Sequence, residues 1–178
     1  MHIEWPGLTD ENTLIISIDT SEFDLRPEGI EIAGKLFKPK QETHITVLGS
    51  TAGSTLSHKI TGEPANEEMV RNAFESTDWS YRRTTDLRHL VRTGAEADAD
   101  TSEESIIVLL EMNGMAQFHQ QLKLLNFIDS DLPLPPAHVT LYTFNCDGGI
   151  GVHSERQLEE LTREQMVCLP ARNAHVND

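Results

Sequence analysis

The chain has 178 residues, of which 38% are apolar and 24% are charged, and this composition is typical of a globular domain. Its formal net charge of −15 disfavours binding to a long polyanion such as extended RNA, whereas a small nucleotide or a short RNA end is easier to accept. The sequence shows no basic, apolar leader, no apolar run of membrane-spanning length and only two cysteines without disulfide or zinc spacing, so we expect a cytoplasmic protein with no membrane partner.

The first half of the chain begins with an apolar run over residues 14–18, which predicts a β-strand. Residues 26–37 carry apolar side chains at helical spacing and predict a helix. After Pro39, the sequence HITV at residues 44–47 predicts a second strand. The stretch 49–66 is rich in Gly, Ser and Thr and predicts a surface loop, placed where it would be able to cover a substrate.

A helix with acidic residues in its first turn is predicted over residues 66–74, followed by a strand over 81–91. On this strand Arg82, Arg88 and Arg92 have like parity and therefore share one face. Two interpretations stay open for them. The arginines line one side of a cleft, or they are solvated strand residues that offset nearby carboxylates.

The second half follows a small, acidic segment at residues 93–104 that predicts a mobile connector. Residues 106–110 predict a strand, and residues 115–125 carry an apolar stripe at helical spacing. The sequence HVTL at residues 138–141 predicts another strand, and the capping box that starts at Ser154 predicts a final helix. The two halves therefore look like diverged repeats of one unit: strand, helix, motif strand, helix, strand.

The two motif strands share the pattern His-apolar-Thr-apolar, and this pattern is the main functional signal. Because successive side chains of a strand point to opposite faces, His44 shares a face with Thr46, and His138 shares a face with Thr140. Imidazoles transfer protons and hydroxyls donate hydrogen bonds to phosphoryl oxygens. Two such pairs suit attack on one side of a phosphate ester and protonation of the leaving group on the other. The alternative is that both strands merely carry a surface His and Thr.

Three further residues are candidates for substrate contact. Tyr142 alternates onto the face shared by His138 and Thr140, where it would approach a base or a phosphate. Arg82 belongs to the arginine-rich strand, and Lys40 precedes the first motif, so both are cationic candidates for phosphate binding. The same two cations are also consistent with solvated surface charge.

The paired motifs resemble those of the 2H phosphoesterases, a family with two H-x-[ST]-x motifs on strands of a bilobal, pseudo-twofold α+β fold. The resemblance extends from about Thr13 to about Leu169, and its specific part is the two tetrapeptides and their spacing. It implies antiparallel sheets that line a central cleft, with helices outside. It also implies hydrolysis or formation of phosphodiesters at ribose 2′ and 3′ oxygens without a metal or a cofactor.

We therefore expect one bilobal domain over residues 1–178, with lobe one at about 13–92, the connector at 93–104 and lobe two at about 105–170. The resemblance assigns catalysis to the two motif histidines and phosphate contacts to the two motif threonines. The expected substrates are small nucleotides or RNA ends that carry a 2′,3′-cyclic phosphate, a 2′-5′ linkage or a cyclic oligonucleotide bond. A non-catalytic nucleotide-binding or protein-interaction module on the same fold is the alternative.

Overall fold

The computed structural model describes residues 1–93 and 102–169, in which an antiparallel sheet and four helices form an α+β fold. The strands are β1 (Leu14–Ile18), β2 (Ile30–Ile32), β3 (Lys35–Pro39), β4 (Thr43–Leu48), β5 (Arg82–Arg92), β6 (Glu103–Glu111), β7 (His138–Phe144) and β8 (Thr162–Met166). The helices are α1 (Ser50–Ile60), α2 (Pro64–Glu75), α3 (Asn113–Leu124) and α4 (Glu155–Leu161), with a 3₁₀ turn at Thr20–Phe23.

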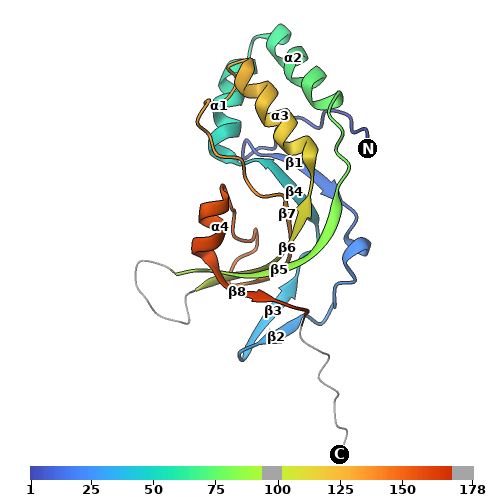
Figure 1. Cartoon of the computed structure of the whole chain (residues 1–178), viewed down its shortest axis with the longest axis vertical. Helices are drawn as coiled ribbons and strands as arrows, with labels where there is room; N and C mark the ends of the chain where they lie inside the picture. Colours follow the sequence, from blue (N-terminus) through green and yellow to red (C-terminus); the bar gives the residue numbers. More distant parts are fainter. Residues whose placement is uncertain (94–101, 170–178) are drawn as a thin grey trace, which may run out of the picture.

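The strand order places the two motif strands side by side. The main path of the sheet runs β1-β4-β7-β6-β5-β8, and β3 pairs with both β2 and β7. Helices α1, α2 and α3 lie together at one end of the molecule, whereas α4 lies by itself next to β5 and β8 (Figure 1). Strands from the two halves of the sequence are interleaved, because β5 pairs with β6 and β8 while β3 pairs with β7.

The two faces of the sheet bury different apolar clusters. Ile45 and Val47 of β4 and Val139 of β7 are fully buried in the main core, together with residues of α1, α2 and α3. Burial of this apolar area is the main stabilising contribution to such a fold. A smaller cluster lies on the opposite face, where Ile107 of β6 pairs with Thr140 of β7 and packs with Leu158 of α4. The motif side chains thus share their face with the smaller cluster.

The helix predicted over residues 26–37 is wrong, because this segment forms the β2–β3 hairpin. Ala33 and Gly34, the two residues between the strands, have φ values of 50° and 78°. A two-residue turn with positive φ at both positions matches the right-handed twist of paired strands and fixes a hairpin. Ile30 then pairs with Phe37, so these two apolar residues, which fit helical spacing in the sequence, lie opposite each other across two strands.

The loop predicted over residues 49–66 is also wrong, because it contains α1 and the start of α2. The buried face of α1 carries Ala52, Gly53 and Leu56 at helical spacing. A Cβ at Gly53 would lie 1.6 Å from the carbonyl oxygen of Asn12, so glycine permits a close backbone approach there. Tertiary packing therefore outweighs the low helix propensity of the Gly-, Ser- and Thr-rich composition.

The remaining predicted elements are present. The strands predicted over residues 14–18, 81–91 and 106–110 correspond to β1, β5 and part of β6, and the helices correspond to α2, α3 and α4. The Ser154 hydroxyl accepts a hydrogen bond from the Gln157 amide at 3.1 Å, which is half of the predicted capping box. Of the predicted connector, Glu103 and Glu104 belong to β6, whereas residues 94–101 lie outside the described residues. Strand β8 is the final strand of the predicted repeat unit, for which no residue range was predicted.

Candidate active site

The two motifs meet across the β4–β7 contact. Ile45 pairs with Val139 in antiparallel register. One residue further in each direction, this register puts His44 opposite Thr140 and Thr46 opposite His138. Opposite residues of an antiparallel pair have Cα atoms about 4.5–5.5 Å apart, and diagonal neighbours such as the two histidines lie about 7–8 Å apart. The four motif side chains therefore form one compact group on one face of the sheet.

His138 is fixed in one orientation by a backbone carbonyl. Its Nδ1 lies 2.8 Å from the carbonyl oxygen of Pro136, and the residue is only 8% exposed. Because a carbonyl only accepts hydrogen bonds, Nδ1 carries the proton and Nε2 of the neutral ring keeps a lone pair. Burial lowers the pKa of His138, the bond to Pro136 opposes this, and the nearby charges of His44 and His153 lower the pKa further. The lowered pKa favours the neutral form of His138, in which Nε2 keeps its lone pair.

His44 is half-buried and has a different electrostatic environment. Burial makes the largest contribution and lowers the pKa of His44, the Lys40 ammonium lowers it further, and the Glu42 carboxylate raises it. Lys40 is therefore close enough to act on this imidazole. The Lys40 ammonium donates a hydrogen bond to the carbonyl of Asp147 at 2.6 Å, and its backbone N–H donates to the carbonyl of Leu141 at 2.9 Å. The structure thus places this predicted contact residue next to the motif group.

The motif threonines are half-buried, and Thr140 is held by a close backbone approach. Gly149 lies against it with φ +85°, and a Cβ at this glycine would lie 3.0 Å from Cγ2 and 3.1 Å from Oγ1 of Thr140. The segment that carries Gly149 is tied to the sheet, because the Ile150 amide donates to the Ser105 hydroxyl at 3.0 Å. A loop between β7 and α4 therefore forms one wall of the candidate site.

Tyr142 does not contact this group, and the predicted alternation fails at this residue. Opposite β7, Ile107 pairs with Thr140 but Ile106 pairs with Tyr142, so Leu141 is an extra residue that forms a β-bulge. The bulge turns Tyr142 into the main core, where it is fully buried and its hydroxyl accepts a hydrogen bond from the Arg26 amide at 2.9 Å. The pairing of β4 with β1 also shifts by one residue directly after Thr46, because Ile15 pairs with Thr46 but Leu14 pairs with Leu48.

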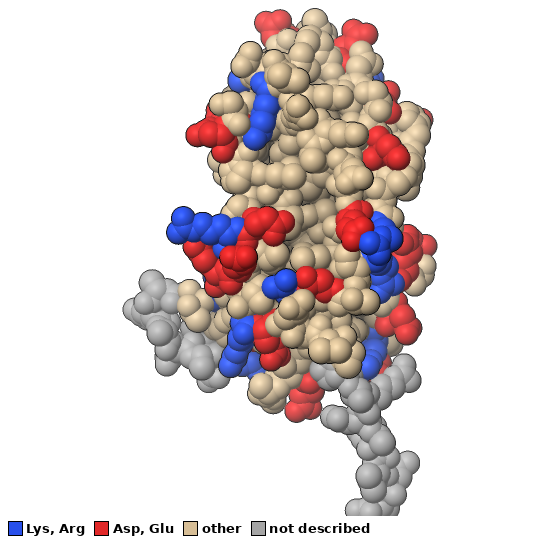
Figure 2. Space-filling view, viewed as in Figure 1, with Lys and Arg blue, Asp and Glu red and all other residues tan. Residues whose placement is uncertain are grey.

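Arg82 lies two strands away from β7 and already has a carboxylate partner. Its guanidinium makes two hydrogen bonds to Glu111 of β6, at 3.1 and 2.5 Å, and both side chains are exposed. Arg88 and Arg92 are paired in the same way, with Asp86 and Glu103, whereas Arg83 donates to the backbone carbonyl of Glu22. On the face drawn in Figure 2, basic and acidic groups lie beside one another rather than in separate patches. The interpretation in which these arginines offset carboxylates therefore fits the contacts.

The candidate site also includes His153, which the sequence analysis did not single out. A Cβ at Gly49 would lie 3.1 Å from the His153 ring, so this imidazole packs against the backbone between β4 and α1. The charge of His153 contributes to the lowered pKa of His138. The His153 amide donates to the Gln157 side chain at 2.7 Å, which fixes its backbone at the start of α4. No spacing in the sequence relates His153 to the motifs, because their proximity arises from the fold of the β7–α4 loop.

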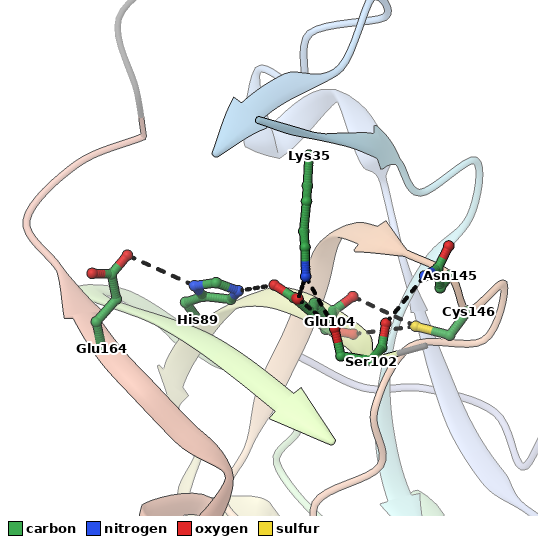
Figure 3. Close-up of polar contacts among 8 residues, drawn as sticks. Lys35, His89, Ser102, Glu104, Asn145, Cys146 and Glu164 are labelled. Carbon is green, nitrogen blue, oxygen red and sulfur yellow. Dashed lines mark hydrogen bonds and ion pairs between the residues drawn. The ribbon is translucent and has the colours of Figure 1, made fainter. Parts of the chain in front are cut away.

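A buried polar network anchors the beginning of this loop (Figure 3). Its labelled members are Lys35, His89, Ser102, Glu104, Asn145, Cys146 and Glu164. Glu104 is almost fully buried, and its carboxylate accepts hydrogen bonds from Lys35, His89 and Ser102. Burial alone would raise the pKa of Glu104, but these three hydrogen bonds together lower it. Because Cys146 donates to the Glu104 carbonyl at 3.5 Å, the network ties β3, β5 and β6 to the loop that follows β7.

Comparisons with protein-family models, with curated proteins and with solved structures give no match for this chain. Within residues 1–93 and 102–169, no group of three or more His, Cys, Asp and Glu side chains is arranged to hold a metal ion. None of the helices in this described part of the chain is long and apolar enough to cross a membrane.

Proposed function

We propose that the chain is a metal-independent phosphodiesterase that acts on nucleotide or RNA-end phosphodiesters by two-histidine acid and base catalysis. The observation that carries this proposal is the antiparallel contact between β4 and β7, with Ile45 opposite Val139. It brings two imidazoles and two threonine hydroxyls, separated by about half the chain, onto one face. Proton transfer by a positioned imidazole contributes about 10²–10⁴-fold to a reaction rate.

In the proposed mechanism, His138 is the base and His44 is the acid. For a 2′,3′-cyclic phosphate, Nε2 of His138 takes a proton from water, and the water oxygen attacks phosphorus. The bond from phosphorus to one ribose oxygen breaks, and that oxygen takes a proton from His44. Thr46 and Thr140 donate hydrogen bonds to the non-bridging oxygens, whose charge grows in the transition state. The lowered pKa and fixed tautomer of His138 support its assignment as the base.

The proposal includes a 2H phosphoesterase-like fold and a small substrate. The second half of the chain follows the predicted order strand, helix, motif strand, helix, strand in β6, α3, β7, α4 and β8, whereas the first half has the β2–β3 hairpin in place of its first helix. The order of the second half is what supports a bilobal 2H phosphoesterase-like arrangement. The net charge of −15 and the paired arginines of β5 favour a small substrate over long nucleic acid. The proposed substrates remain a 2′,3′-cyclic phosphate, a 2′-5′ linkage or a cyclic oligonucleotide.

The experiment is a substrate panel with matched histidine variants. We would assay hydrolysis of 2′,3′-cyclic mononucleotides, 2′-5′ and 3′-5′ dinucleotides, and cyclic di- and trinucleotides in the presence of a strong chelator. His44→Ala and His138→Ala should each lower turnover by about a hundredfold or more. His58→Ala is the control, because His58 is an exposed residue of α1. Full turnover in both motif variants, or turnover that needs an added divalent ion, would overturn the proposal.

A second candidate function is a nucleotide-binding module without catalysis. It is favoured by one observation, the lowered pKa of both motif histidines, because two neutral imidazoles lack an acid for the leaving group. Binding of a cyclic nucleotide without turnover at any pH between 5 and 8 would support this candidate over the enzyme.

A further inference from the structure

Strand β1 forms one end of the main sheet, and its outer edge has no partner strand among the described residues. The path of the sheet begins at β1, which pairs with β4 alone. Within residues 1–93 and 102–169, no backbone hydrogen bond outside the sheet involves residues 14–18. An unpaired strand edge presents a row of N–H and C=O groups with which a further strand can pair.

A groove runs along this edge. Its volume is about 510 Å³, and its wall combines Ile3 and Leu8 of the N-terminal segment with Ile15, Ile16 and Ser17 of β1. Figure 1 shows the N-terminal segment beside β1. Side chains of consecutive strand residues point to opposite faces, so a groove that touches three consecutive residues follows the edge of the strand rather than one face. An extended peptide in this groove would reach both backbone groups and apolar side chains.

The two ends of the main sheet differ in how they resist pairing with another chain. The opposite end is β8, whose central residues Arg163, Glu164 and Gln165 are all exposed. Charged side chains on an edge strand oppose the addition of a further strand. Strand β1 has the sequence LIISI, without a charge or a proline, and its register shift lies at its first residue. The remaining four residues of β1 thus form a regular edge without the usual protection.

The surroundings of this edge are acidic. Residues 1–25 contain six Asp and Glu residues, all of them exposed, and no Lys or Arg. Asp10 lies shortly before β1 and Asp19 directly follows it, so carboxylates lie beyond both ends of the edge. The amino group of Met1, which also lines the groove, is paired with Asp78. Complementary charge steers and selects a partner, so this edge favours a segment that carries Lys or Arg.

A second copy of this chain is a less suitable partner. In an antiparallel pair of β1 strands, the acidic residues that precede β1 in one copy would lie beside those that follow it in the other. Like charges placed opposite each other destabilise a strand pair. The net charge of −15 on each copy adds to this repulsion.

We propose that the outer edge of β1 binds an extended, basic peptide segment of another protein by β-strand addition. The backbone of the peptide pairs with β1, alternate apolar side chains contact the groove, and alternate Lys or Arg side chains face the surrounding carboxylates. The groove includes none of the four motif residues, so this inference does not depend on the proposed function.

The experiment uses synthetic peptides as probes. The test peptide is KVKVKVK with blocked ends, in which apolar and basic side chains alternate as a strand requires. One control has the same sequence with every backbone nitrogen methylated, so it keeps the charge and the side chains but has no N–H to donate. The other control, EVEVEVE, reverses the charge. At an ionic strength of about 0.15 M, which screens general attraction, KVKVKVK should bind at least about tenfold more tightly than either control in isothermal titration.

Two protein variants and one exchange measurement locate the binding. Ile15→Lys and Ser17→Lys each place a cation on β1 and should weaken binding of KVKVKVK by about tenfold. Leu124→Lys is the matched control, because it gives the same change of charge at an exposed residue at the end of α3. Thermal unfolding checks that each variant is folded. In the wild type, the outward amide protons of β1 should exchange quickly when free and become protected when KVKVKVK is bound.

Several outcomes would overturn the proposal. Equal affinity for KVKVKVK and its methylated form would show attraction of charge without strand pairing. Unchanged affinity in both Ile15→Lys and Ser17→Lys, no new protection of β1 amides, or no binding of KVKVKVK would each count against the edge as a binding site. Sedimentation without peptide tests the second copy: a dimer that both lysine variants dissociate would assign the edge to self-association instead.

Discussion

Gly149→Ala should lower both the stability of the protein and its proposed activity through Thr140. Gly149 has φ +85°, where an L-residue costs about 1–2 kcal/mol. The added Cβ would also lie 3.0 Å from Cγ2 and 3.1 Å from Oγ1 of Thr140, so this side chain must move by a few tenths of an ångström. We expect the free energy of unfolding to fall by about 1–2 kcal/mol, which corresponds to a Tm lower by about 2–8 °C for a chain of this size. Turnover should fall by about tenfold, because a misplaced oxyanion donor loses part of its effect.

The neighbouring glycine supplies the control for this prediction. A Cβ at Gly148 meets no atom within 4 Å and its φ is not positive, so Gly148→Ala should retain turnover and leave stability equal or slightly higher. Thr140→Ser removes Cγ2 but keeps the hydroxyl, so adding it to Gly149→Ala should recover part of the lost turnover. Urea unfolding and steady-state kinetics check these results. If Gly148→Ala and Gly149→Ala behaved alike, or if Gly149→Ala lost stability at full turnover, Thr140 would not have the proposed role.

Three further predictions follow from the charges. Burial and then the Lys40 ammonium lower the pKa of His44. Lys40→Gln should therefore raise this pKa and move the alkaline limb of the kcat/KM profile to higher pH, whereas Lys40→Arg keeps the charge and should not. An NMR titration of His44 checks this pKa. Arg82→Ala should change KM by less than about twofold, because this exposed guanidinium already pairs with a carboxylate; steady-state kinetics would show a larger change if it bound substrate. His44, His119 and His138 all have lowered pKa values in the folded protein, so the unfolded chain binds more protons as the pH falls below about 6.5. The free energy of unfolding should therefore decrease from pH 7.5 to 5.5, by at most about 1.4 kcal/mol per pH unit for each histidine; urea unfolding that is independent of pH would contradict this.

The sequence predicted the motif strands well because strand periodicity is a local property. The alternation of His44 with Ile45, and of His138 with Val139, already separates a polar face from a buried one. The pairing of these two strands is not local, and the sequence indicated it only through the repetition of the pattern. The β2–β3 hairpin was missed because its turn uses Ala33 before Gly34, and alanine is not a typical residue at positive φ.

Other parts of the site depend on tertiary contacts that no residue pattern encodes. Tyr142 was placed on the wrong face because a bulge at Leu141 interrupts the period of two, and a single extra residue reverses every later side chain. His153 was missed because it lies in a loop, where no periodicity predicts the direction of a side chain. Its imidazole reaches the site by packing against Gly49. The helix α1 was missed because packing of Leu56 and the close approach at Gly53 outweigh its composition.

Under the proposed function, the lowered pKa of both motif histidines makes the substrate part of the proton-transfer system. A phosphodiester anion bound between the two imidazoles favours their charged forms and raises both pKa values. His44 is the less buried ring, so its protonation costs less desolvation than protonation of His138, which is almost fully buried; the Lys40 ammonium still lowers the pKa of His44, and the Glu42 carboxylate raises it. His138 meanwhile keeps its Nδ1 proton on the Pro136 carbonyl and its Nε2 lone pair towards the reaction. The acid therefore forms when the anion binds, and the difference in burial between the two rings decides which of them becomes the acid.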